Sequence, residues 1–175
     1  MSPTSLPSKL TAIGFAKTGD VGVIQNLDLP FPSPAPDQIV EYAGVNFLDV
    51  QLRTGRYPVP ALPATLGVEA AGTIVVLPTD EAVLKSEAFQ KRCFKVGSKV
   101  ACVCPPSFPA AKCIPMLTMN ITFHLPQLGL AVGTFAEYTL APWRAVFPLP
   151  PSVSPRVGAA SLVQGLTALT FASEA

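Results

Sequence analysis

Short apolar runs alternate with turns rich in glycine and proline along most of this chain. Leu10–Phe15 has the alternating pattern of a half-buried strand, and Ile39–Val45 and Gly67–Val76 are rich in β-branched or small residues that suit buried strands. Three further strands, each entered through a turn, are expected in TGDVGVIQNLDLP, FKVGSKVACV and GTFAEYTL. This pattern predicts a mainly β, barrel-like domain with few helices.

Two segments have helical spacing instead. The residues from Asn46 to Gly55 predict a short helix, with Asn46 suited to cap its start and Gly55 to end it. Residues 153–175 predict one longer helix, capped by Ser154 and with Pro155 in its first turn. An apolar stripe along one face of that helix would consist of Ala159, Leu162, Leu166 and Leu169.

Composition excludes some classes of protein. The 175 residues are enough for one domain with a core, and the net charge of +1 comes without a basic run, so nucleic-acid binding is not expected. The N-terminus lacks the apolar stretch of a secretory signal. We therefore expect a cytoplasmic protein whose four cysteines are reduced thiols.

One stretch, residues 113–136, contains no Asp, Glu, Lys or Arg and is long enough to cross a bilayer. Pro115, Asn120, His124 and Pro126 interrupt it, and polar groups at membrane depth are costly. A membrane span is therefore not expected.

Three blocks of sequence carry a family resemblance: AGVNFLDVQLRTGRYP (43–58), LGVEAAGTIV (66–75) and GTFAEYTLAP…LPPSVSPRVGAASLVQGLTAL (133–169). They resemble the N-terminal, GroES-like domain of the medium-chain dehydrogenase/reductase superfamily, and within it the zinc-free quinone oxidoreductases of the zeta-crystallin type. The resemblance implies a GroES-like, partly open β-barrel over residues 1–152. It also implies that residues 153–175 begin a helix leading toward a Rossmann cofactor domain, which we expect to be absent from this chain.

The resemblance also bears on zinc. Zinc-dependent relatives carry a cysteine and a histidine where this chain has Asn46 and Val68, and neither Asn nor Val is a usual zinc ligand. Glu69 alone cannot hold a metal. The four cysteines lack the short, regular spacing of a structural zinc lobe: Cys93, Cys102, Cys104 and Cys113. No zinc site is expected.

By resemblance, the activity would be NADPH-dependent reduction of quinones or other α,β-unsaturated carbonyl compounds. Asn46 and Tyr57 would orient the acceptor, and Asn46 and Thr167 would contact the cofactor. The residues alone also allow simpler roles: a helix cap for Asn46, packing on a proline for Tyr57, and a hydrogen bond to the i−4 carbonyl for Thr167. Asp49 is interpreted as an ordinary acid of the first helical turn, with Arg53 solvated or paired to it.

The chain also departs from the family pattern. Residues 105–132 have no family counterpart, and we hypothesise that this irregular insert, like the early stop, comes from a gene-model error. The strand before Tyr42 looks short, which predicts weakened pairing in the core. Most cofactor contacts would be missing. Two interpretations stay open: part of a quinone reductase that is inactive alone, or an inert GroES-like module with an interaction role; homo-oligomers fit either.

Overall fold

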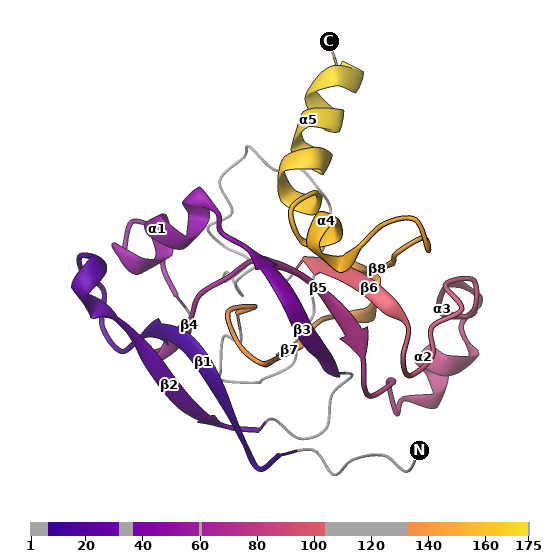
Figure 1. Cartoon of the computed structure of the whole chain (residues 1–175), viewed down its shortest axis with the longest axis horizontal. Helices are drawn as coiled ribbons and strands as arrows, with labels where there is room; N and C mark the ends of the chain where they lie inside the picture. The colour runs from indigo at the N-terminus through magenta and orange to yellow at the C-terminus, as the bar shows by residue number, and fades with distance from the viewer. Residues whose placement is uncertain (1–6, 32–36, 60, 104–132, 175) are drawn as a thin grey trace.

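The computed structural model describes residues 7–31, 37–59, 61–103 and 133–174 (Figure 1). Its strands are β1 Lys9–Phe15, β2 Ile24–Pro30, β3 Asp37–Gly44, β4 Ala64–Thr65, β5 Glu69–Ile74, β6 Lys99–Val103, β7 Tyr138–Leu140 and β8 Val146–Pro148. Its helices are α1 Phe47–Arg53, α2 Glu81–Lys85, α3 Glu87–Gln90, α4 Pro155–Ala159 and α5 Leu162–Glu174, with short 3-10 turns η1 Val21–Val23 and η3 Trp143–Ala145.

The strands form two antiparallel sheets, one in the order β2-β1-β4 and the other in the order β7-β3-β5-β6-β8. The segment before β7 connects them, because Ala136 bridges Ala12 of β1 and the N–H of Ile13 donates to the Phe135 carbonyl at 2.7 Å. The predicted mainly β, barrel-like domain is confirmed. Figure 1 shows α1 beside the smaller sheet, and α2 and α3 at the far edge of the larger one.

Alternation builds the core as the sequence predicts. In β1 the alternate positions Leu10 and Ala12 are buried in one core cluster, and Phe15, on the opposite face at the end of the strand, is buried in another. The central strand β5 is buried on both faces, which its small residues Ala70 and Ala71 permit. The weakened pairing expected for the strand before Tyr42 is wrong. β3 pairs with both β5 and β7, and a register shift between Val40 and Tyr42 accommodates the irregularity.

The single helix predicted over residues 153–175 is also wrong, because the chain forms two helices separated at Ala160 and Ser161. Ser154 caps α4 and Pro155 opens it, as predicted. The N–H of Val163, in the first turn of α5, donates to the buried Glu69 carboxylate at 2.8 Å, so the second helix begins at a side-chain cap of its own. The predicted apolar stripe ends early: Ala159 is buried, whereas Leu169 is 65% exposed.

The sequence did not predict the two helices α2 and α3, which lie in the charged stretch after β5. Asp80 and Ser86 cap them, accepting from the N–H groups of Ala82 and Phe89 at 2.8 and 3.3 Å. Each helix has only four or five residues, too few for apolar periodicity to appear.

Several expectations fall on residues outside the described ranges. They concern the insert at 105–132, the thiols of Cys104 and Cys113, His124, and most of the apolar stretch 113–136. Among the helices that are described, none has the length and apolar character needed to cross a bilayer.

Candidate functional site

Asn46 lies between β3 and α1, at the N-cap position predicted for it. Asp49, three residues on, accepts the backbone N–H of Asn46 at 2.8 Å. The carboxamide of Asn46 points elsewhere: its Nδ2 donates to Glu69 Oε1 at 2.9 Å, and its Oδ1 accepts from Gln164 Nε2 at 3.0 Å. Asn46 therefore joins the start of α1 to β5 and to the first turn of α5.

Glu69 is the centre of this arrangement, and its side chain is fully buried at the start of β5. Its two oxygens accept different donors, the Asn46 carboxamide and the backbone N–H of Val163. A buried carboxylate is tolerated only where hydrogen bonds replace water, and both oxygens meet that requirement. The chain makes room for Glu69 through Gly44, where a Cβ would lie 2.4 Å from Oε1.

The interpretation of Asp49 as an ordinary acid of the first helical turn is corrected, because its side chain is fixed by burial and by two hydrogen bonds. It is buried, and its second oxygen accepts the N–H of Gly67 at 2.8 Å. Burial raises the pKa of the Asp49 carboxyl; the N–H groups of Asn46 and Gly67 oppose the rise, and the Glu69 charge adds to it. Arg53 donates to the Gly19 carbonyl instead of pairing with Asp49.

The other two candidate residues, Tyr57 and Thr167, form none of the hydrogen bonds of this cluster given above. Tyr57 follows the far end of the seven-residue α1, about 10 Å along the helix from Asn46. Its half-buried ring packs against the core cluster that contains Phe15 and Leu52. Thr167 is exposed on α5, one turn beyond Val163 and Gln164 and on the same helix face.

Two members of the cluster were missed as site residues. From the sequence, Glu69 was considered only as a metal ligand, and Gln164 only as part of the block at 133–169 that carries the family resemblance. The signal for Glu69 was present in the sequence, since a single acid in the otherwise apolar strand EAAGTI must be paired if buried. Gln164 carried no such signal, because its partner lies 118 residues away in the chain.

The arrangement suits hydrogen bonding better than metal binding. Val68, where zinc-dependent relatives have histidine, is a buried apolar side chain, and the described residues contain no group of three or more His, Cys, Asp or Glu placed to hold a metal. The exposed amide of Gln164 and the hydroxyl of Thr167 can bind polar groups of a nicotinamide nucleotide beside Asn46. α5 contains no Lys or Arg to bind the phosphates.

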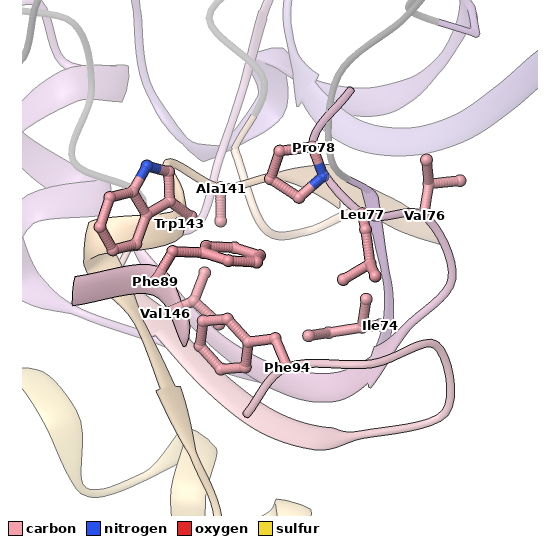
Figure 2. A pocket seen from close by; sticks show the side chains of 9 residues that line it. All are labelled: Ile74, Val76, Leu77, Pro78, Phe89, Phe94, Ala141, Trp143 and Val146. Atoms are coloured by element: carbon pink, nitrogen blue, oxygen red, sulfur yellow. The ribbon is translucent and has the colours of Figure 1, made fainter. Parts of the chain in front are cut away.

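An apolar depression lies at the opposite edge of the larger sheet, next to α3 (Figure 2). The ring of Phe89 meets Trp143 and Phe94 edge-on, with centroids 5.5 and 5.8 Å apart, and the Arg92 guanidinium lies over the Trp143 ring. All the side chains that line it are apolar or aromatic, and no polar groups converge there. This depression is a packing feature that holds α3 against the sheet, and the polar cluster around Asn46 is the stronger candidate site.

Comparisons with known proteins agree with the fold. The family model of the alcohol dehydrogenase GroES-like domain matches residues 39–151. A probable quinone oxidoreductase of Schizosaccharomyces pombe is 32% identical over 163 residues, which cover 91% of this chain and 39% of that protein. Quinone oxidoreductase 1 of Escherichia coli is 40% identical over 67 residues, covering 37% of this chain and 20% of that protein.

Solved structures give the same result. A quinone oxidoreductase of Pseudomonas syringae superposes with a TM-score of 0.67 at 25% identity, over 93% of this chain and 40% of that one. The Escherichia coli quinone oxidoreductase in complex with NADPH superposes with a TM-score of 0.62 at 26% identity, over 92% of this chain and 40% of that one. The chain thus spans about two fifths of these structures.

The β-rich fold and these matches agree with one another. The chain belongs to the alcohol dehydrogenase GroES-like domain family, within the medium-chain dehydrogenase/reductase superfamily and of the quinone oxidoreductase type.

Proposed function

We propose that this chain supplies the acceptor-binding part of an NADPH-dependent reductase of quinones or other α,β-unsaturated carbonyl compounds. The observation that carries the proposal is the Asn46 carboxamide, held between buried Glu69 and Gln164 at the base of α5. A rigidly held amide next to exposed polar groups provides a preorganised wall for a nucleotide and a small carbonyl acceptor. The NADPH complex of the Escherichia coli relative supports the choice of cofactor.

In this proposal, Asn46 and Tyr57 orient the acceptor, and Asn46 and Thr167 contact the cofactor. The cofactor, when bound, supplies the hydride, and the residues of this chain position the reacting groups without a metal. The phosphates need basic or backbone donors that α5 does not offer, so we assign them to a nucleotide-binding domain outside these residues. We expect the protein in the cytoplasm.

The proposal can be tested with a fusion protein. The chain would be joined through α5 to the nucleotide-binding domain of the Escherichia coli quinone oxidoreductase, and quinone-dependent NADPH oxidation would be measured. We expect turnover by the fusion and little or none by the chain alone, because one wall of the site binds the cofactor weakly. A well-folded fusion without turnover, beside an active parent enzyme, would reject the proposed function. Turnover by the chain alone would reject the need for a second domain.

A matched pair of variants tests the contact with the cofactor. Thr167→Val removes an exposed hydroxyl next to the polar cluster, whereas Thr170→Val removes a hydroxyl that bonds the Leu166 carbonyl at 2.9 Å on the same helix. We expect Thr167→Val to weaken NADPH binding by the fusion about threefold to tenfold, the value of one hydrogen bond. Thr170→Val should leave the dissociation constant unchanged. Equal effects of the two variants would remove Thr167 from the site.

A second candidate function is an interaction module without catalysis. The observation in its favour is α5, which projects from the body of the domain (Figure 1) and exposes 65% of Leu169 and 67% of Phe171. Sedimentation of the purified chain tests the interaction module. A stable homo-oligomer that Leu169→Ser with Phe171→Ser dissociates would show that the exposed end of α5 is an interaction surface, whereas a monomer would contradict self-association through α5.

A further inference from the structure

We infer that Glu69 is a positioning residue that fixes the orientation of the Asn46 carboxamide and fastens it to the first turn of α5. The inference rests on the proposed function, because it assigns how the Asn46 site is held. The geometry supporting it is a chain of hydrogen bonds from α1 through β5 to α5, with Glu69 in the middle.

Glu69 determines which end of the Asn46 amide faces which way. A carboxylate can only accept hydrogen bonds, so Asn46 must turn its Nδ2 toward Glu69 Oε1. The second hydrogen of Nδ2 faces the Gly44 carbonyl at 3.3 Å. Asn46 Oδ1 is then left toward α5, where it accepts from Gln164 and keeps one further lone pair. A hydrogen-bond donor that approaches Asn46 from the site can therefore bind its Oδ1.

Glu69 also connects this amide to α5. Its Oε2 accepts the Val163 N–H, one of the groups in the first helical turn that has no partner within the helix. The negative charge at this position is further favoured by the positive end of the helix dipole. The position of the helix that carries Gln164 and Thr167 and the orientation of Asn46 thus depend on the same carboxylate.

The carboxylates of this cluster are not a vacant cation site. Glu69 and Asp49 present four oxygens, and each of them accepts a hydrogen bond from an N–H group. Carboxylates prepared for a metal would keep oxygens free and converging, and the described residues form no such group. Positioning is the role that this geometry supports.

The inference predicts a reciprocal rescue. In Glu69→Gln the new amide offers only one oxygen. With the Asn46 amide in its present orientation, the new NH₂ must face either Asn46 Nδ2 or the Val163 N–H, so that one bond is lost or the Asn46 amide turns over. The double variant Asn46→Asp with Glu69→Gln restores the bonds between positions 46 and 69 and to Val163 and Gln164, and it lacks only the longer bond to the Gly44 carbonyl. Its new amide at position 69 donates to the new carboxylate at position 46 and accepts from the Val163 N–H, and that carboxylate still accepts from Gln164. Glu41→Gln is the matched control, because Glu41 is an exposed acid of β3 bonded to Thr73 and Lys99.

The test is NMR of the ¹⁵N-labelled full chain, reading the Asn46 side-chain NH₂ resonances and amide hydrogen exchange at Val163. We expect Glu69→Gln to shift the Asn46 resonances and to speed Val163 exchange about tenfold to hundredfold, the effect of one lost buried hydrogen bond. The double variant should restore slow exchange, and Glu41→Gln should change neither readout. Unchanged readouts in Glu69→Gln, or a double variant no better than the single, would overturn the inference. If Glu69→Gln fails to fold, a folded double variant supports the inference and an unfolded one overturns it.

Turnover of the fusion protein separates this inference from the proposed function. With both correct, Glu69→Gln lowers kcat for quinone reduction about tenfold, more than it raises KM for NADPH, because it misplaces a positioning group. No turnover in any variant, together with NMR rescue, would leave Glu69 as the positioning group of a site with another function. Full turnover with disturbed Asn46 resonances would instead show that the reaction does not depend on this amide.

Discussion

The two ends of α5 differ in what they contact. At the first turn, Val163 and Gln164 bond Glu69 and Asn46, and Leu162 packs against Ala71, Ala101 and Ala159 of the core. Two turns later Leu169 and Phe171 are largely exposed, and Figure 1 shows the helix leaving the body of the domain. The contrast indicates that the first turn of α5 is part of the packed domain, whereas the far end of the helix contributes little to the stability of the fold.

The largest loss of stability is expected for an alanine at Gly67, which leaves no space for a side chain. Gly67 has φ +94°, and a Cβ there would lie 2.4 Å from Thr134 Oγ1 and 2.7 Å from the Phe135 backbone nitrogen. Gly97 has a similar φ of +89° with no atom near the missing Cβ. We expect Gly67→Ala to lower the free energy of unfolding by about 3–5 kcal/mol and Gly97→Ala by about 1–2 kcal/mol. Urea denaturation measures both, and equal losses would mean that the surroundings of Gly67 relax freely.

A smaller loss of stability is expected from substitutions in α5, and it should differ between the two ends of the helix. Leu162→Ala removes contacts with the core and should cost about 1–2 kcal/mol, less than a fully buried leucine because Leu162 is only half-buried. Leu169→Ala should change the free energy of unfolding by less than about 0.5 kcal/mol, since the side chain is mostly in water. The same denaturation measurement applies. A cost for Leu169→Ala equal to that of Leu162→Ala would show that the distal helix is packed after all.

The smallest effect is a difference in pH dependence between two carboxylates. Burial raises the pKa of Asp49 above 3.8, so its contribution to stability is fully present below 3.8 and is lost as pH rises through the raised pKa. Hydrogen bonds from Lys99 and Thr73 lower the pKa of Glu41 below 4.5, so its contribution is present above 4.5 and is lost as pH falls.

Subtracting the free energy of unfolding of a variant from that of the wild type isolates the contribution of the Asp49 or the Glu41 carboxyl. The stability difference between wild type and Asp49→Asn should fall as pH rises from 3.8, whereas that between wild type and Glu41→Gln should rise with pH toward 4.5. Urea denaturation in steps of pH checks both slopes. Slopes of the same sign would mean that Asp49 is not desolvated in the folded chain.

The sequence contained most of this fold because local patterns and long-range contacts agree. The alternation in β1 and the small residues of β5 predicted buried strands, and Ser154 with Pro155 predicted the start of α4. Patterns failed where a tertiary contact decides the outcome. The break between α4 and α5 is accompanied by a hydrogen bond from the Val163 N–H to Glu69, which lies 94 residues earlier in the chain. The exposure of Leu169 likewise cannot be known from an apolar stripe alone, because the stripe does not say what covers it.

Sequence patterns likewise identified one part of the candidate site and missed another. The sequence identified Asn46 at a strand-to-helix junction, and the structure places it there. It did not identify Glu69 or Gln164 as its partners, because their hydrogen bonds join segments 23 and 118 residues away. The roles of Asn46, Tyr57 and Thr167 stay predictions from the family resemblance.

Amide hydrogen exchange along α5 of the isolated chain tests the central claim most directly. The account predicts slow exchange at Val163 and Gly165, whose N–H groups bond Glu69 and the Ser161 carbonyl, and exchange at least about a hundredfold faster beyond Leu169, where the helix lacks packing to protect it. Uniform protection along the whole helix would contradict the account, because it would show that the distal turns are as firmly held as the first.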